Sequence, residues 1–398
     1  MRICHVSPHL PPDQAANALL PAQLGRWMAA HGDDVIFVAH EPAQTGRGPD
    51  ALTPWLPRDD DSSGAGRDLP VRWIPRRRGG ATLRRRLKID AWILARRVHS
   101  TLDDSASRAD LLHLHSNGLI IEAAADWARR RRVPYLLTLY GTEIWHYRKR
   151  WPVDRFTRAY RGAERVTFYS QRLMERAKIE GLDRSGLSVV YPVVGDTFAP
   201  RDETTRQEWR RALGITDRFV VLNVKRLHEL AGQRFLIDAF ARLCQRRRDV
   251  RLLICGDGPL REDLAARAAA AGVADRMTMT GVVPNTVIAR YAAIADVFAL
   301  PSLLEALPTV AVEALASGTP VISADHPGGV ELHDLFGEDV ALVPRESVEP
   351  LADALGAFFD RPRRTLPATA DTLAAHFRPT AVFSAYQSLY SSLARTTS

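Results

Sequence analysis

The sequence predicts an α/β fold in two domains, each built on a parallel sheet with helices on both faces. Three observations lead to this prediction. Short apolar runs typical of buried strands alternate with helical segments along most of the chain. The 398 residues are enough for two domains with well-buried cores. Residues 192–200, PVVGDTFAP, have the composition of a linker, so we expect a domain boundary near residue 192.

The first half of the chain alternates expected strands with expected helices. Strands are expected at residues 3–7, 34–40, 71–75, 111–116, 134–140, 165–170 and 187–191. Helical periodicity falls between them, at residues 17–31, 83–100 and 118–131. Residues 41–70 are rich in proline, glycine and aspartate and predict a long excursion. Their three consecutive aspartates, 59–61, are expected to be solvated rather than to bind a metal.

The second half continues the alternation. A helix is expected at residues 203–213 and a strand at 219–224. Ile254-Cys255-Gly256-Asp257-Gly258 predicts a strand that turns into a helix, but without the third glycine of a nicotinamide dinucleotide site. Further strands are expected at 296–300 and 320–324, and a final helix at 378–395.

Composition favours a globular protein of a reducing compartment. Hydrophobic residues make up 46% of the chain and charged residues 25%, which are ordinary proportions. No apolar run approaches the length of a membrane-spanning helix, and residues 1–10 do not resemble a signal peptide. Cys4, Cys244 and Cys255 have neither metal-ligand nor disulfide spacing. We therefore expect a cytoplasmic protein.

The net charge of +8 is concentrated in the first half. Residues 1–192 contain 31 Lys and Arg against 21 Asp and Glu, which leaves the remaining residues at −2. This excess favours an anionic partner, such as a membrane surface, a phosphate-bearing acceptor or nucleic acid, with a solvated arginine-rich surface as the alternative. Aromatic residues do not interleave with the basic ones on a recognised nucleic-acid module, so we expect no nucleic-acid partner.

A basic amphipathic segment lies at residues 76–97. Apolar residues recur there at helical spacing, at Leu83, Leu87, Ala91, Leu94 and Val98, beside Trp92. A basic helix with a tryptophan on its apolar flank can lie in an anionic membrane interface, which would place the protein at the inner membrane face. The alternative is that the apolar stripe packs on the sheet while the arginines face water.

Residues 301–318, PSLLEALPTVAVEALASG, organise the predicted site. Glu305 lies in a loop at the carboxyl end of a strand, and Glu313 lies near the start of a helix for which Thr309 is the expected N-cap. The unpaired N–H groups of a helix N-terminus suit a phosphate. Two carboxylates on either side of a phosphate would suit hydroxyl groups. A nucleotide sugar has that layout of ribose, diphosphate and sugar.

A wider pattern around this segment resembles a known family. Pro-Ser, the two glutamates eight residues apart, Ala-Ser-Gly-Thr-Pro-Val-Ile-Ser, Gly328-Gly329 and Glu331 occur in one register. The pattern is similar to the donor site of family-4 glycosyltransferases, which are retaining enzymes of the GT-B fold, with two Rossmann-like doubly wound domains facing a central cleft. The resemblance implies an acceptor domain, 1–192, completed by helix 378–398, and a nucleotide-sugar domain, 193–377.

The resemblance also implies roles for single residues. Glu305 would contact the transferred sugar and Glu313 the ribose. Arg226 matches a family arginine that faces the diphosphate, whereas Ala231 replaces the family's lysine five residues on, and Lys225 is expected to supply the missing charge. Further donor contacts are implied for Gly256, Gly258, Val282, Leu307, Pro308, Thr309 and Ala16, of which Ala16 stands where the family has glycine. No metal and no other cofactor is expected.

Candidate acceptor contacts lie in the first half. Tyr140 stands where the family often has a histidine beside the reacting sugar, and it cannot carry a proton near neutral pH as imidazole does. His115, Glu143 and Arg148 are the expected acceptor-binding residues, and His115 is expected to line the cleft. His113 and His115 have no evident third ligand nearby, so we do not expect a zinc site.

The resemblance thus implies transfer of a sugar from a nucleotide diphosphate sugar, UDP- or GDP-linked, to an acceptor hydroxyl with retention at the anomeric carbon. The acceptor could be a glycan, a lipid-linked molecule or a small molecule, in polysaccharide or glycoconjugate synthesis. Two alternatives remain open, a non-catalytic nucleotide-sugar or glycan binder and a sugar-nucleotide epimerase on the same fold. The base, sugar, acceptor and oligomeric state are not identified by the sequence.

Overall fold

The computed structural model describes residues 1–398 except 12, 14–15, 43–68, 77–88, 150–153 and 397–398. The chain divides into two compact units. The first unit comprises Met1–Tyr191 and Val382–Ser398, and the second unit comprises Pro192–Ala381. The expected excursion at 41–70 and the basic residues of the expected helix before Ile89 fall almost wholly outside the described residues.

The first unit is built on a seven-stranded parallel sheet in the order β3-β2-β1-β4-β5-β6-β7. Its strands are β1 (Arg2–Ser7), β2 (Asp34–His40), β3 (Val71–Ile74), β4 (Leu111–His115), β5 (Tyr135–Leu139), β6 (Arg165–Phe168) and β7 (Leu187–Val189). Every residue of β4 and β5 is buried. Strands that are buried along their whole length require cover on both faces of the sheet.

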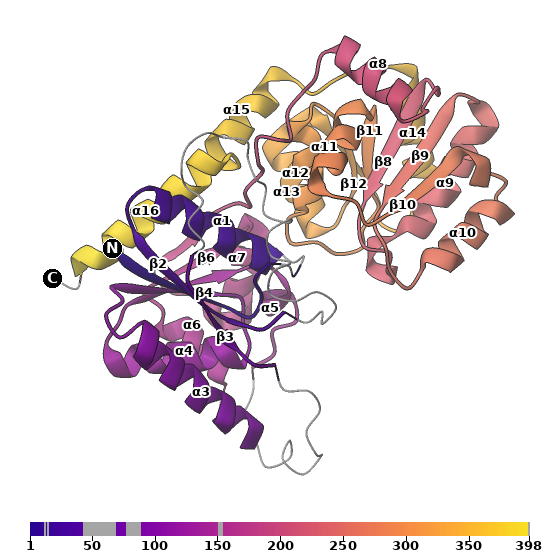
Figure 1. The fold of residues 1–398 in the computed structure, drawn as a ribbon. Coiled ribbons are helices and arrows are strands. Elements are labelled where there is room, and N and C mark those ends of the chain that lie inside the picture. Colours follow the sequence, from indigo (N-terminus) through magenta and orange to yellow (C-terminus); the bar gives the residue numbers. More distant parts are fainter. Residues whose placement is uncertain (12, 14–15, 43–68, 77–88, 150–153, 397–398) are drawn as a thin grey trace. The chain divides into compact units, whose positions relative to one another are not determined.

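Helices supply that cover. In Figure 1, α3 (Ile89–Ser105), α4 (Leu119–Arg131) and α6 (Arg155–Gly162) lie on one face of the first sheet, whereas α1 (Ala16–Ala30), α7 (Gln171–Ala177) and α16 (Pro379–Thr396) lie on the other. Short α5 (Thr142–Trp145) and the wide turn Lys178–Leu182 complete this unit among the described residues. Helix α4 ends with three arginines, which complement its dipole, and with Arg132 in the left-handed region.

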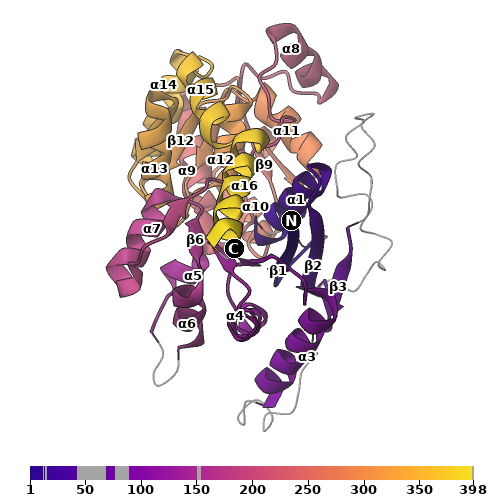
Figure 2. The same cartoon turned by 90° about the vertical axis from the view of Figure 1, so that its left-hand side faces the viewer.

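The second unit is built on a six-stranded parallel sheet in the order β10-β9-β8-β11-β12-β13. Its strands are β8 (Phe219–Val224), β9 (Val250–Cys255), β10 (Met277–Gly281), β11 (Val297–Leu300), β12 (Val321–Ala324) and β13 (Val340–Val343). Its helices are α8 (Glu203–Ala212), α9 (Gln233–Arg246), α10 (Arg261–Ala270), α11 (Asn285–Ile294), α12 (Thr309–Ala316), α13 (Pro327–Phe336), α14 (Glu349–Asp360) and α15 (Pro367–His376). Figure 2 shows the same elements from the side.

The elements expected from the sequence are confirmed where they are described, with one correction. The strands begin and end within two residues of the expected bounds. Thr309, however, is the first residue of α12 rather than its cap. Pro308 takes the cap position and offers no side-chain hydrogen bond. Among the helices of the described residues, none combines the length and apolarity needed to cross a membrane.

Candidate functional site

The candidate site lies at the carboxyl edge of the second sheet, between β8 and β11. These strands are neighbours in space, but the chain order reverses at this point, from β10-β9-β8 on one side to β11-β12-β13 on the other. At such a reversal the loops that follow the two strands diverge and leave a crevice for a ligand. The loop after β8 begins at Lys225, and the loop after β11 contains Glu305.

An ion pair joins these two loops. Lys225 Nζ lies 2.5 Å from Glu305 Oε1, and the two side chains keep 22% and 16% of their exposure. Arg226, the next residue, is exposed, and its guanidinium forms no ion pair with any described residue. This edge of the sheet therefore carries two adjacent cations, of which Lys225 is neutralised by the Glu305 carboxylate and Arg226 is unpaired.

Two glycines let the loop after β9 pack against Lys225. A Cβ on Gly256 would lie 2.1 Å from the carbonyl oxygen of Lys225, and Gly256 has a φ of +140°. A Cβ on Gly258 would lie 2.3 Å from the carbonyl oxygen of Leu227. The amide of Leu227 donates to the carbonyl of Asp257 at 3.0 Å. Only glycine permits this approach, so Gly256 and Gly258 fix the loop that carries Lys225 and Arg226.

Glu313 lies in the second turn of α12, where its carboxyl group is partly shielded from water. Burial raises the pKa of Glu313 to about 8, although the residue as a whole is only half-buried. Its side chain makes no hydrogen bond or ion pair with a described residue. Because Pro308 supplies no side-chain cap, the first amides of α12 also remain available. A desolvated carboxyl group without a partner, beside a helix N-terminus, suits a ligand that carries hydroxyl groups and phosphate.

Two histidines that are not among the expected site residues border Glu305. Burial lowers the pKa of His326 to about 4, and its Nδ1 accepts the amide of Gly329 at 2.9 Å as the cap of α13. The amide of Gly328 donates to the carbonyl of Glu305 at 3.1 Å. Burial also lowers the pKa of His228, and Lys225 adds to that shift. Both imidazoles are therefore neutral near pH 7, and they can donate or accept hydrogen bonds without adding charge.

The first unit has a second polar group at the carboxyl edge of its sheet, around Tyr140. The Tyr140 hydroxyl lies 2.8 Å from His115 Nδ1, and His115 Nε2 lies 3.0 Å from His5 Nδ1. His113 contacts the hydroxyl groups of Tyr390 at 2.6 Å and Thr138 at 2.7 Å. Burial lowers the pKa of all three histidines, to about 3 for His5.

This network corrects two expectations. His115 does not line a surface, because it is fully buried with both ring nitrogens engaged. A third histidine, His5, does lie beside His113 and His115, on the neighbouring strand β1. The rings of His5 and His115 stack, with centroids 5.3 Å apart, whereas those of His113 and His115 are tilted, with centroids 3.9 Å apart. Of the six nitrogens of these three rings, only His5 Nε2 lacks a hydrogen-bond partner. One nitrogen from each ring lies within 4.8 Å of the others. Five of the six ring nitrogens already form hydrogen bonds, so the cluster is a hydrogen-bonded network within the core.

The other acceptor candidates differ in exposure. Glu143 is 4% exposed, and it accepts hydrogen bonds from the Ser116 hydroxyl at 2.5 Å and from the Gly141 amide at 2.8 Å. Ser116 has a φ of 73°, in the left-handed region that is costly for a residue other than glycine. Glu143 therefore holds a strained loop in place, whereas Arg148 is exposed and available.

The remaining candidate donor contacts are divided between the two units. Val282 is 58% exposed after β10, and Leu307 is buried in the loop before α12. Ala16 begins α1 in the first unit. Ala231, the position of the missing lysine, is fully buried in a single turn of 3₁₀-helix and points no charge at the edge. Within the second unit, the fold thus brings together Lys225, Arg226, Glu305, Gly256 and Gly258 around the reversal.

Two family models match the chain, one in each half. A model described as "Glycosyl transferase 4-like domain" matches residues 21–193, and one described as "Glycosyl transferases group 1" matches residues 205–368. The 2-deoxystreptamine N-acetyl-D-glucosaminyltransferase of Streptomyces fradiae is 32% identical over 289 residues, which cover 67% of this chain and 67% of that protein. The chain belongs to the family-4, group 1 glycosyltransferases.

Other relatives of this family-4 member are matched over less of their length. The GDP-mannose-dependent alpha-(1-6)-phosphatidylinositol monomannoside mannosyltransferase of Mycolicibacterium smegmatis is 34% identical over 51% of this chain and 54% of its own. The chain spans 64%, 44% and 59% of three further curated glycosyltransferases. The solved structure of Anabaena Alr3699/HepE in complex with UDP aligns with a TM-score of 0.74 at 18% identity, over 98% of this chain and 100% of that one. This likeness, with two parallel-sheet units, confirms the expected GT-B fold.

Proposed function

We propose that this protein transfers a sugar from a nucleotide diphosphate sugar to an acceptor hydroxyl, with retention at the anomeric carbon. The observation that carries the proposal is the Lys225–Glu305 pair at the strand reversal, beside the unpaired Arg226. As the sugar–phosphate bond breaks, negative charge grows on the departing diphosphate. Fixed cations aimed at that charge would stabilise the transition state.

In this proposal, the protein's own cationic groups stabilise the departing diphosphate. Arg226 would bind the diphosphate directly, and the uncapped start of α12 would offer backbone amides to it. Lys225 would replace the lysine that Ala231 removes from the family pattern. The proposal accordingly includes no metal ion, and turnover is expected to survive a chelator.

Glu305 and Glu313 would hold the two ends of the donor. Glu305 would accept hydrogen bonds from the sugar hydroxyls, and the unpartnered carboxyl group of Glu313 would bind the ribose. Transfer on the front face of the donor requires no protein nucleophile. Tyr140 could therefore position the reacting sugar without carrying a proton. Relatives that use GDP-mannose and a neighbour that binds UDP support a GDP- or UDP-sugar as donor.

The acceptor would bind the first unit in this proposal. Arg148 is the exposed candidate contact there, and the basic balance of residues 1–192 supports an anionic or lipid-linked acceptor. The mannosyltransferase relative is named for a phosphatidylinositol-linked substrate. Membrane association of the first unit would bring the enzyme to such an acceptor.

The test is a panel of UDP-, GDP-, ADP- and dTDP-sugars, with thermal shift and slow hydrolysis to free nucleotide as readouts. Wild type is compared with Arg226→Ala and Glu305→Ala. The matched controls are Arg248→Ala and Glu208→Ala, which remove exposed charges from the same unit. One nucleotide sugar is expected to stabilise the protein and to be hydrolysed, and both site variants are expected to lose hydrolysis while the controls keep it.

Other outcomes would point to the alternatives. Binding without turnover, even with candidate acceptors present, would favour a nucleotide-sugar binder. Exchange of a carbon-bound proton of the sugar with solvent would favour an epimerase. If no nucleotide sugar binds, the proposal is wrong.

A further inference from the structure

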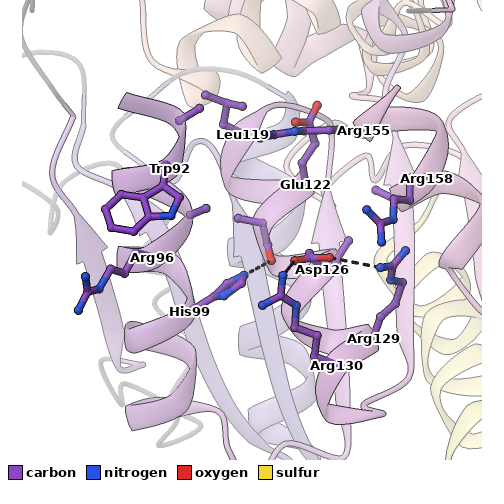
Figure 3. Close-up of a pocket in the computed structure, with 15 residues that line it drawn as sticks. Trp92, Arg96, His99, Leu119, Glu122, Asp126, Arg129, Arg130, Arg155 and Arg158 are labelled. Carbon is purple, nitrogen blue, oxygen red and sulfur yellow. Dashed lines mark hydrogen bonds and ion pairs between the residues drawn. The ribbon is translucent and has the colours of Figure 1, made fainter. Parts of the chain in front are cut away.

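A large groove opens on the first unit between α3, α4 and α6. Its volume is about 1060 Å³, slightly more than that of most small-molecule sites. Figure 3 shows Trp92, Arg96 and His99 along α3 and Asp126 with Arg129 and Arg130 on α4. Arg155 and Arg158 enter from α6. His99 Nε2 lies 3.1 Å from the carbonyl of Ala123, so a hydrogen bond ties α3 to α4 along the floor.

Arginine dominates the charge of this groove. Asp126 is engaged by Arg129 at 3.2 Å and by Arg130 at 2.7 Å. Arg96, Arg155 and Arg158 are exposed, and none of the three forms an ion pair with a described residue. Five arginines and two carboxylates, Glu122 and Asp126, line the groove, so its net charge is positive and favours an anion. Guanidinium binds phosphate oxygens in a fixed, bidentate geometry.

Helix stability does not account for the arginines of α6. Arg155 is its first residue and Arg158 its fourth, after the cap Asp154. The N-terminus of a helix carries partial positive charge, so cations in the first turn are disfavoured. By contrast, Arg129 and Arg130 lie in the last turn of α4, where they complement the dipole. A bound anion would offset the unfavourable electrostatic energy of Arg155 and Arg158 at the start of α6.

Large apolar side chains stand beside these charges. Trp92 is 62% exposed and Leu119 is 43% exposed, and both line the groove. The guanidinium of Arg96 lies 5.6 Å from the centre of the Trp92 ring. The core-facing side of α3 is occupied by Val98 and Leu102, which are fully buried, whereas Trp92 is exposed to the side of them. Tryptophan and arginine together suit the interface between lipid headgroups and acyl chains.

We propose that the α3–α4–α6 groove binds the phosphate headgroup of an anionic phospholipid in a bilayer, with Arg96, Arg155 and Arg158 around the phosphate and with Trp92 and Leu119 at the acyl boundary. This site gives the proposed membrane contact a defined surface outside residues 76–88. It does not depend on the transferase reaction, and it can be tested without a donor.

The test is co-sedimentation of the full chain with vesicles of phosphatidylcholine alone or with added phosphatidylglycerol. Wild type is compared with R96Q/R155Q/R158Q. The matched control, R211Q/R248Q/R361Q, removes the same charge from three exposed arginines of the second unit. Basic residues near an anionic surface contribute about 1 kcal/mol each, so the groove variant is expected to lose roughly a hundredfold in vesicle affinity. The control is expected to stay close to wild type.

Two further measurements separate the groove from general electrostatics. Brominated lipid is expected to quench the tryptophan fluorescence of wild type more than that of Trp92→Phe. Inorganic phosphate at millimolar concentration is expected to compete weakly with the vesicles. Equal losses in the groove and control variants would overturn the proposal, because net charge alone would then explain binding. Stabilisation by inorganic phosphate without vesicle binding would also overturn it.

Discussion

Glu313 combines a protonated carboxyl group at neutral pH with a position suited to a donor ribose. Its raised pKa, about 8, results from burial and not from a neighbouring carboxylate. Two ribose hydroxyls would donate to the carboxylate and stabilise its charged form. Binding would then release a proton, and nucleotide affinity would depend on pH.

Nucleotide affinity is therefore expected to rise with pH up to about 8 and to level off above that value. Below the pKa, the rise approaches tenfold per pH unit, because each binding event releases one proton. Titration calorimetry in buffers of different ionisation enthalpy measures both the affinity and the proton. Glu313→Gln removes the titration and is expected to show a flat profile. A variant profile as steep as that of wild type would contradict the assignment.

Lys225 is the second residue whose role can be measured alone. Lys225→Met removes the cation opposite Glu305 and is expected to slow turnover by roughly a hundredfold, the scale on which a fixed transition-state donor acts. Lys225→Arg retains the charge and is expected to keep part of the rate. Steady-state hydrolysis of the donor checks both variants. An unchanged rate in Lys225→Met would mean that Lys225 only forms a structural ion pair with Glu305 and does not contribute to turnover.

For single residues, the sequence predicts which ones lie at strand ends but not which of them contact one another. Lys225, Arg226 and Glu305 follow apolar runs, so their position at a carboxyl edge could be predicted. The ion pair between Lys225 and Glu305 could not, because it depends on β8 and β11 being neighbours. The neutral state of His228 and His326 could not be predicted either, since it results from burial.

Among the structural elements, the loop after β9 determines where the loop after β8 can lie. Gly256→Ala is expected to destabilise the second unit by roughly 3 kcal/mol, because a Cβ would meet the Lys225 carbonyl oxygen at 2.1 Å in addition to the strain of a positive φ. The matched control is Gly272→Ala. Gly272 also has a positive φ, of 69°, but a Cβ there would meet nothing within 4 Å, so only the strain of about 1 kcal/mol remains.

Urea unfolding with circular dichroism measures both glycine variants. A difference near 2 kcal/mol between them would isolate the contact with Lys225 from backbone strain. Gly256→Ala is also expected to weaken donor binding, since the clash displaces the Lys225 backbone. Equal stability of the two variants would show that the loop relaxes freely.

The strands and helices could be predicted from hydrophobic periodicity and composition, but the order of the strands in each sheet could not. The strands at 3–7 and 111–116 read as buried runs, and each carries histidine. Only the pairing of β1 with β4, which sets His5 opposite His113, shows that three histidines form one cluster. The pairing of β4 with β5 has a similar effect, because it brings Tyr140, which follows β5, within 2.8 Å of His115 at the expected edge position.

Across the whole molecule, both units should lose stability in acid, but the first more steeply, because it holds three fully buried histidines whereas the second holds His228 and His326. His5, His113 and His115 are neutral in the folded first unit because burial lowers their pKa, whereas in the unfolded chain they titrate near the ordinary value of about 6.5. A lowered folded pKa gives stability that is complete above the unfolded pKa. That stability is lost as the pH falls, because the unfolded state binds the protons.

The first unit is therefore expected to lose stability from about pH 6.5 down toward pH 3, at up to roughly 4 kcal/mol per pH unit once all three histidines contribute. Tryptophan fluorescence follows this unit selectively, since seven of the eight tryptophans precede residue 192 and Trp209 alone follows it. Denaturant midpoints from pH 7.5 to 4.5 measure the loss. His31→Gln, which changes an exposed histidine, serves as the control and is expected to keep the same pH profile. A first unit with unchanged midpoints at pH 5 would mean that the three histidines are charged in the folded state, which the full burial and close contact of their rings argue against.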